Sequence, residues 1–108
     1  MQIIKTDILI MGSGVAGLRA ALATREKGLN VLVVGKNTPG RGTATILSGG
    51  GFSGGWGGLT TRDHLDLTLK TGRGLNDIAL TQILADEAPK RFREMKQWGL
   101  PTRDRKGG

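Results

Sequence analysis

The chain has 108 residues, which allows one modest domain with a small core. Its formal net charge is +7, and the basic residues are scattered, a pattern typical of a solvated surface. The absence of cysteine excludes disulfide bonds, thiolate chemistry and iron–sulfur ligation within the chain.

The first 35 residues predict the order strand, turn, helix, strand. Ile3–Met11 is a short apolar run that predicts a buried strand ending at glycine. Between Gly14 and Lys27 the apolar residues recur at helical spacing, and Gly28 is the expected stop. The β-branched run Val31–Val34 predicts a second buried strand, parallel to the first. The sequence therefore predicts an α/β fold, with the β-α-β start of a partial Rossmann-like dinucleotide-binding fold and a helical C-terminal part.

The turn between the first strand and the helix has the pattern G-x-G-x-x-G over Gly12–Gly17. The first glycine permits the tight turn, the second lets backbone approach a pyrophosphate, and the third lets the helix pack on the strand. Free N–H groups and the helix dipole at this point favour phosphate charge. Because the motif follows a strand and opens a helix, it predicts a dinucleotide site.

The end of the second strand leaves the identity of the dinucleotide open. An acidic residue that binds the cofactor's ribose is expected there, but the chain has Gly35 followed by Lys36. A basic residue at the end of this strand, with no acidic residue beside it, is compatible with the 2′-phosphate of NADP. It is equally compatible with FAD held through main-chain contacts.

The middle of the chain predicts turns and a loop. Asn37–Gly40 is a turn, and Thr43–Ser48 predicts a short helical turn. Residues 49–58 contain seven glycines. Such a cluster is typical either of a flexible linker or of backbone that approaches a ligand closely.

Residues 61–72 fit two kinds of element. Leu65, Leu67 and Leu69 alternate as in a strand, whereas Leu65 and Leu69 also share one helix face. The helical alternative has Thr61 as N-cap and Gly72 as stop. The pattern alone does not decide between them.

Asn76–Trp98 predicts a helical stretch that Pro89 breaks or bends, giving two helices or one bent helix that ends at Gly99. Two i,i+4 pairs, Asp86–Lys90 and Glu87–Arg91, support it. Arg103–Gly108 is a polar tail. The apolar stripe of the helical stretch consists of Leu80, Leu84, Ala88, Phe92 and Met95.

Beyond the second strand the chain resembles the flavoprotein subunits of succinate dehydrogenase and fumarate reductase, with L-aspartate oxidase and adenylylsulfate reductase as relatives. Pro39 and Arg41 precede a small-residue stretch, Thr43–Gly50, as in that family. Asp66–Gly74 is similar to the family's D-T-L-x-x-G-x-G-L, and Glu87–Pro101 to its E-A-P-x-R … W-G-x-P. The resemblance covers nearly the whole chain. It implies that residues 61–72 are helical and that the cofactor is FAD.

The resemblance also implies a domain organisation and a set of cofactor-binding residues, with no catalytic and no metal-binding residue in this chain. Residues 1–108 would be the N-terminal part of an FAD-binding domain, with a glycine-rich flavin loop at 40–58 and a helical segment at 62–99. The implied cofactor-binding residues are Gly12, Ser13, Gly14, Ala16 and Gly17 at the pyrophosphate, Gly35 and Lys36 along the adenosine ribose, Thr43, Ala44 and Thr45 on the path toward the flavin, and Ser48, Gly49, Gly50 and Gly51 near the isoalloxazine ring.

Two departures from the family refine this expectation. Members that bind FAD covalently carry histidine where this chain has Thr43, so the resemblance implies noncovalent FAD. The sole histidine, His64, matches none of the family's substrate-binding histidines, and we expect it on a helix surface.

The resemblance implies part of a flavin-dependent oxidoreductase of the fumarate reductase/succinate dehydrogenase type, with hydride transfer through flavin N5 in the complete enzyme. We expect this chain alone to be catalytically incomplete. The expected partners are the remainder of the flavoprotein or a companion subunit, together with an electron-transfer subunit. Ile8–Met11 is too short to span a membrane, so we expect no membrane insertion and a cytoplasmic location. The alternatives are an NADP-binding Rossmann module and, from the charge, a basic nucleic-acid-binding module.

Overall fold

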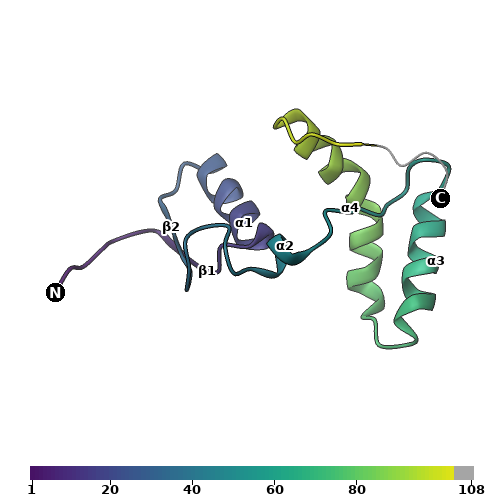
Figure 1. Ribbon diagram of the computed structural model, residues 1–108, viewed down its shortest axis with the longest axis horizontal. Helices are drawn as coiled ribbons and strands as arrows, with labels where there is room; N and C mark the ends of the chain where they lie inside the picture. Colours follow the sequence, from purple (N-terminus) through teal and green to yellow (C-terminus); the bar gives the residue numbers. More distant parts are fainter. Residues whose placement is uncertain (104–108) are drawn as a thin grey trace. The chain divides into compact units, whose positions relative to one another are not determined.

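The structure, a computed structural model, describes residues 1–103 and divides the chain into two compact units (Figure 1). The first unit comprises residues 1–51, and the second begins at Phe52. The predicted polar tail begins at Arg103, and its residues after Arg103 lie outside the described residues. The elements in chain order are β1 (Ile8–Met11), α1 (Val15–Glu26), β2 (Val31–Val34), α2 (Ala44–Leu47), α3 (Thr61–Gly72) and α4 (Ile78–Gln97).

The first unit is a β-α-β arrangement in which α1 packs against both strands. β1 and β2 pair in parallel, with Ile8 opposite Val31 and Met11 opposite Val34. The ladder continues by one bond, because the Gly12 N–H donates to the Val34 carbonyl at 2.8 Å. The prediction of an α/β chain that starts with two parallel strands is confirmed.

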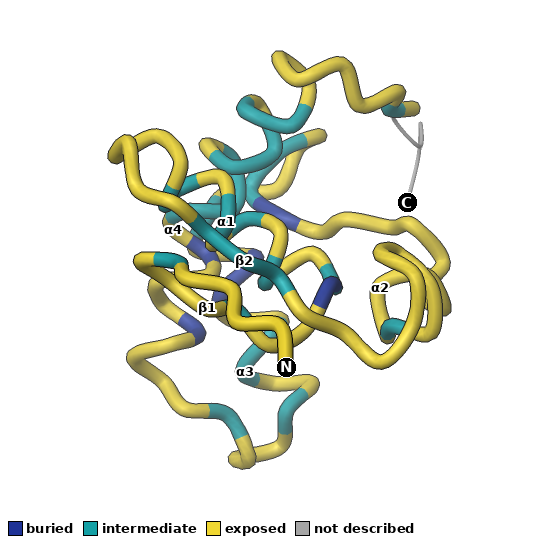
Figure 2. Tube along the Cα trace, turned by 90° about the vertical axis from the view of Figure 1, so that its left-hand side faces the viewer, coloured by how far each residue is buried: buried dark blue, intermediate teal, exposed yellow. Residues whose placement is uncertain are grey.

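The first strand is shorter and more exposed than predicted. Ile3 and Ile4 lie before it, since β2 begins opposite Ile8 and pairs with nothing earlier. Met11 is 84% exposed, and Figure 2 shows intermediate or exposed residues along both strands. A four-residue strand spans about 13 Å, whereas a 12-residue helix spans about 18 Å. Two such strands and one helix offer too little facing surface to enclose a core.

The helix of the first unit has the predicted bounds. It begins after Gly14 and ends at Lys27, and Gly28 follows with a φ of +76°, a conformation that suits glycine. The Asp7 carboxylate then accepts a hydrogen bond from the Asn30 N–H at 2.7 Å. This bond fixes the start of β2 beside the start of β1.

The second unit pairs α3 with α4. The leucine-rich segment is a helix, as the family resemblance implied, but its N-cap is Thr60 and not Thr61. The Thr60 hydroxyl accepts from the Asp63 N–H at 3.1 Å, and the Asp63 carboxylate accepts from the Thr60 N–H at 2.8 Å. This reciprocal capping box satisfies two backbone donors, which is why the earlier threonine is preferred.

α4 is one helix that runs through Pro89 and changes direction in its second half (Figure 1). Of the two predicted outcomes, the bent helix is therefore the observed one. The predicted pair of Glu87 and Arg91 forms at 2.6 Å, and Glu94 joins it at 2.7 Å. The hydrogen bonds that Arg91 donates to Glu94, and then those to Glu87, raise the pKa of Arg91. Asp86 instead accepts hydrogen bonds from Gln82.

The first half of the predicted apolar stripe of α4 is not its buried face. Leu80 is 65% exposed and Leu84 55% exposed, whereas Thr81 and Ala85 are buried. Small side chains let two helices approach closely, and α3 packs on α4. In this half of α4 the contact face is therefore offset by one residue from the predicted stripe. The later residues of the stripe are half-buried, namely Ala88, Phe92 and Met95.

The expectation that His64 lies on a helix surface is wrong. His64 is 8% exposed, and with Leu65 it forms the buried part of α3. Its Nδ1 is buried without a hydrogen-bond partner among the described residues. His64 lies in the first turn of α3, next to the buried Leu65, on the helix that packs against α4.

An aromatic cluster completes the second unit. Trp56 stacks on Phe92 with ring centroids 4.9 Å apart and planes 16° apart, and Phe52 lies 5.8 Å from Phe92. The Lys96 ammonium lies 5.0 Å from the Phe92 centroid. Gly54 is buried, and a Cβ atom there would overlap the Trp56 ring. Gly54 and Trp56 therefore pack within the second unit, inside the stretch 49–58 for which the sequence predicted a loop.

Candidate functional site: a cradle at the start of α1

The end of β2 lies beside the β1–α1 turn. Ser13 is 6% exposed and is the one buried residue of residues 1–51, all of which the structure describes. A Cβ atom added to Gly35 would lie 3.2 Å from the Ser13 hydroxyl oxygen. The absence of a side chain at Gly35 therefore keeps the strand end close to the turn.

Two glycines of the motif are required by the turn itself. Gly12 has a φ of +117°, which side-chain-bearing residues rarely adopt, and the space around its missing Cβ is open. A Cβ atom on Gly17 would overlap the Gly12 carbonyl oxygen and lie 3.3 Å from Ile10 Cγ2. Gly17 thus lets α1 approach β1, as the motif predicts.

The N-terminus of α1 receives its side-chain acceptor from far along the chain. Gly14 is the N-cap and offers no side-chain hydrogen bond. The Val15 N–H instead donates to the Thr45 hydroxyl at 3.0 Å, across thirty positions of sequence. A Cβ atom on Gly14 would lie 3.2 Å from that hydroxyl oxygen and 3.8 Å from Thr43 Cβ. The segment that carries α2 therefore lies against the motif.

We call the group formed by residues 12–17, 35, 43 and 45 the cradle, and the remaining predicted site residues lie at its edge or away from it. Lys36 and Ala44 are exposed, Lys36 directly after Gly35 and Ala44 at the start of α2. The Ser48 hydroxyl donates to the Thr45 carbonyl at 2.7 Å and so closes α2. A Cβ atom added to any glycine of Gly49–Gly51 would have no neighbouring atom within 4 Å. The structure gathers residues 12–17, 35, 43 and 45, but it does not bring residues 49–51 against them.

The cradle is suited to an anion. The first helix bond of α1 runs from the Leu18 N–H to the Gly14 carbonyl at 3.0 Å, so the N–H groups of Ala16 and Gly17 have no acceptor within the helix. The first turn of α1 contains no acidic residue that would compete for them. Unpaired N–H groups and the helix dipole favour phosphate at such a point.

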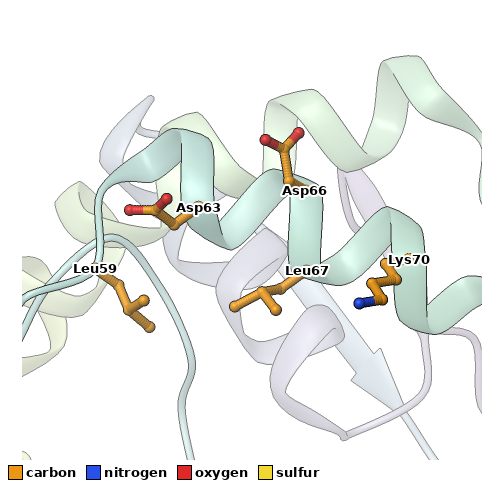
Figure 3. Close-up of a pocket in the computed structure, with 5 residues that line it drawn as sticks. All are labelled: Leu59, Asp63, Asp66, Leu67 and Lys70. Carbon is orange, nitrogen blue, oxygen red and sulfur yellow. The ribbon is translucent and has the colours of Figure 1, made fainter.

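A second candidate site, a shallow pocket on α3, offers fewer unpaired polar groups than the cradle. Figure 3 shows a depression along α3, where Leu59, Leu67 and Lys70 point to one side of the helix and Asp66 to the other. Its carboxylates already have partners, since Asp63 belongs to the capping box and Asp66 pairs with Arg62 at 3.1 Å. Among residues 1–103, no group of three or more metal-ligating side chains comes together.

The fold and the cradle are typical of one class of protein, the α/β modules that bind a dinucleotide. Comparison with known proteins narrows this class, because the model of the FAD binding domain family matches residues 7–108. The chain belongs to this family of FAD-binding domains, and its cofactor is FAD.

The relatives are flavoproteins of the predicted type. The 8-methylmenaquinol:fumarate reductase flavoprotein subunit of Wolinella succinogenes is 40% identical over 109 residues, which cover 94% of this chain and 17% of the relative. L-aspartate oxidase of Streptomyces coelicolor is 39% identical over 92 residues, 85% of this chain and 16% of the relative. The mitochondrial succinate dehydrogenase (ubiquinone) flavoprotein subunit of Oryza sativa is 36% identical over 98 residues, 88% of this chain and 15% of the relative.

The chain spans less than one fifth of the length of these relatives. No solved structure matches it significantly. None of the three names describes an NADP-binding or nucleic-acid-binding protein, so those alternatives are not favoured. Within the described part of the chain, no helix has the length and apolar character needed to cross a membrane.

Sequence reasoning missed two contributions to this site. One is the bond from Val15 to Thr45, and the other is the tie from Asp7 to Asn30. A signal for the first was present, because a helix whose N-cap is glycine needs an acceptor from elsewhere. Nothing in the sequence indicates which of the many threonines supplies it.

Proposed function

We propose that the cradle at the start of α1 holds the pyrophosphate of FAD, through Gly12, Ser13, Gly14, Ala16 and Gly17. The observation that supports this most is the N-terminus of α1. Its N–H groups lack intrahelical acceptors, it carries no acidic residue in the first turn, and Gly14 places no side chain of its own at the approach.

The other predicted residues extend from this cradle in both directions. Gly35 and Lys36 follow β2 and would lie along the adenosine ribose, the lysine supplying a positive charge where an acid is usual. Thr43, Ala44 and Thr45 would line the path toward the flavin. Ser48, Gly49, Gly50 and Gly51 would approach the isoalloxazine ring, which suits backbone without side chains. The predicted flavin loop at 40–58 and helical segment at 62–99 belong to the same proposal.

The complete protein would be a flavin-dependent oxidoreductase of the fumarate reductase/succinate dehydrogenase type, and this chain the N-terminal part of its FAD-binding domain. FAD supplies hydride transfer at flavin N5, while this chain binds and orients the cofactor. The two parallel strands would belong to a full Rossmann fold. The partners would be the rest of the flavoprotein or a companion subunit, together with an electron-transfer subunit. The cytoplasmic location stays a prediction that cell fractionation checks.

Replacing Gly14 tests the proposal directly. Gly14→Val would place branched carbons where the pyrophosphate is proposed to lie, beside Thr45 and Thr43. In the full-length protein we expect the Kd for FAD to rise by about 100-fold or more, equivalent to ~3 kcal/mol. Flavin fluorescence quenching measures the Kd, and circular dichroism checks that helix content is kept.

Ala20→Val is the matched control, because it adds the same branched carbons to the exposed side of α1, outside the cradle. It should leave the Kd for FAD unchanged. An unchanged Kd in the Gly14 variant would show that the motif does not bind the cofactor.

We also propose that FAD is bound without a covalent link. Thr43 stands where covalent family members carry histidine, and the chain contains neither cysteine nor tyrosine as a substitute. The one histidine, His64, is buried in the second unit. Acid precipitation of the full-length protein should leave the flavin in the supernatant. A yellow pellet whose mass includes FAD on this chain would contradict the proposal.

A further inference from the structure

The first backbone donor of α1 is already paired. Helix geometry leaves the N–H groups of the first turn without intrahelical acceptors, and a side chain at the N-cap normally accepts from one of them. Gly14 cannot do so. The Val15 N–H donates instead to the Thr45 hydroxyl at 3.0 Å.

The cap and the proposed pyrophosphate site share the same end of α1. The Thr45 hydroxyl oxygen would lie 3.2 Å from a Cβ atom on Gly14, so it lies over the glycine that the motif reserves for a phosphate. A hydroxyl is a neutral acceptor, and an ionised phosphate oxygen forms a shorter and stronger bond with an N–H donor. A phosphate therefore outcompetes the hydroxyl when both reach for the same N–H.

Thr45 is also tied to a larger segment. The Ser48 hydroxyl donates to the Thr45 carbonyl at 2.7 Å, and the Ser48 N–H donates to the Ala44 carbonyl at 3.1 Å. The single turn of α2 is thus held together locally. A change at the Thr45 hydroxyl therefore affects the position of α2 and not only of one side chain.

We infer that Thr45 is a positioning residue, an internal cap that holds α2 on the N-terminus of α1 until the pyrophosphate of FAD displaces it. The inference rests on the proposed function, because the displacing ligand is the same cofactor. Part of the free energy of FAD binding is then used to break the hydrogen bond between the Val15 N–H and the Thr45 hydroxyl. Loss of the Thr45 hydroxyl should therefore favour FAD binding, although Thr45 also lines the proposed path toward the flavin. A hydroxyl that bound the cofactor would have the opposite effect.

The experiment compares Thr45→Val and Thr45→Ser with wild type in the full-length protein. Thr45→Val keeps the branched side chain but removes the hydroxyl that accepts the hydrogen bond. We therefore expect the Kd for FAD to fall about fivefold. This factor corresponds to the ~1 kcal/mol that an N-cap hydrogen bond contributes to stability. Without FAD, hydrogen exchange measured by mass spectrometry should be faster in the peptide that contains Val15. Thr45→Ser keeps the hydroxyl and should behave as wild type in both measurements.

Thr24→Val is the matched control, since the Thr24 hydroxyl donates within α1 to the Ala20 carbonyl, away from the cradle. It should leave FAD affinity unchanged. If valine at position 45 prevents folding, Thr45→Ala carries the same expectation. If the folded Thr45 variant binds FAD as tightly as wild type or more weakly, the inference is overturned. The proposed function still holds in that case, provided that the wild-type protein binds FAD. A wild-type protein that binds no FAD overturns both.

Discussion

The two units of the chain differ in what their tightest glycines allow. In residues 1–51, Gly17 lets α1 approach the Gly12 carbonyl, whereas in the second unit Gly54 makes room for the Trp56 ring. The first unit has one buried residue, Ser13, whereas the second buries Leu65 and Ala85 between its helices.

The two units are therefore held together by different interactions. The first unit is positioned by hydrogen bonds and close backbone approach, which leave N–H groups of α1 without intrahelical acceptors and little apolar core. The second is positioned by helix caps and by side-chain packing. Substitutions that add atoms should therefore damage the first unit most, and substitutions that remove atoms should damage the second.

The largest effect on stability is expected from Gly17→Ala. Helix propensity alone favours alanine by about 1 kcal/mol. The added Cβ overlaps the Gly12 carbonyl oxygen, however, and overpacking against backbone costs about 3 kcal/mol or more. We expect the free energy of unfolding of the first unit to fall by ~2 kcal/mol. Faster hydrogen exchange in α1 measures this loss.

The control is Gly49→Ala, since Gly49 has no atom within 4 Å of its missing Cβ, and it should leave exchange unchanged. Both tryptophans of the chain, Trp56 and Trp98, lie in the second unit. Their fluorescence should therefore stay the same in the Gly17 variant. Equal exchange rates for Gly17→Ala and wild type would contradict the close approach of α1 to β1.

Removing atoms from the second unit should have the next largest effect. Trp56→Ala deletes the ring stacked on Phe92, at a cost of about 1.5 kcal/mol for a ring that is only partly buried. Urea unfolding followed by circular dichroism measures the loss. Phe52→Ala is the comparison, because Phe52 meets the same ring in a tilted geometry and is 52% exposed. A Phe52 variant that loses more stability than the Trp56 variant would show that the stack does not hold the unit together.

The features that the sequence predicted are those that one residue type dictates locally. The turn at Gly12–Gly17, the stop at Gly28 and the parallel pair around α1 follow from backbone requirements that only glycine or β-branched runs meet. The assignment of individual residues to the cofactor rests on the family resemblance and stays a prediction.

The features that the sequence did not predict depend on distant partners. The bond from Val15 to Thr45 joins two segments that no local pattern connects. The burial of His64 and the exposure of Leu80 depend on which side of each helix meets the other, and Thr81 and Ala85 occupy that side because they are small. Periodicity finds an apolar stripe, but it does not say whether a partner covers it.

A smaller effect, with the opposite sign, is expected at the end of α3. Arg73 has a φ of +49° and is the one residue other than glycine with positive φ within residues 1–103. Glycine adopts this conformation without strain, so Arg73→Gly should stabilise the second unit by about 0.5–1 kcal/mol. A higher midpoint of thermal unfolding measures the gain. Arg73→Ala removes the same charge but keeps a Cβ atom, so a gain of the same size in that variant would assign the effect to charge.

The smallest effect is a dependence of α3 on pH. Hydrogen bonds from the Thr60 hydroxyl and then from the Thr60 backbone lower the pKa of Asp63. The folded pKa therefore lies below the unfolded one. The capping box contributes its full stability above the ordinary carboxyl pKa and loses it as the pH falls through the lowered value. Asp63 is exposed, so solvent screens the effect and the shift in midpoint should be small. Asp63→Asn should remove this component of the acid dependence while Asp66→Asn, one turn further along, should keep it. A wild-type midpoint with the same acid dependence as the Asp63 variant would show that the carboxylate does not stabilise the start of α3.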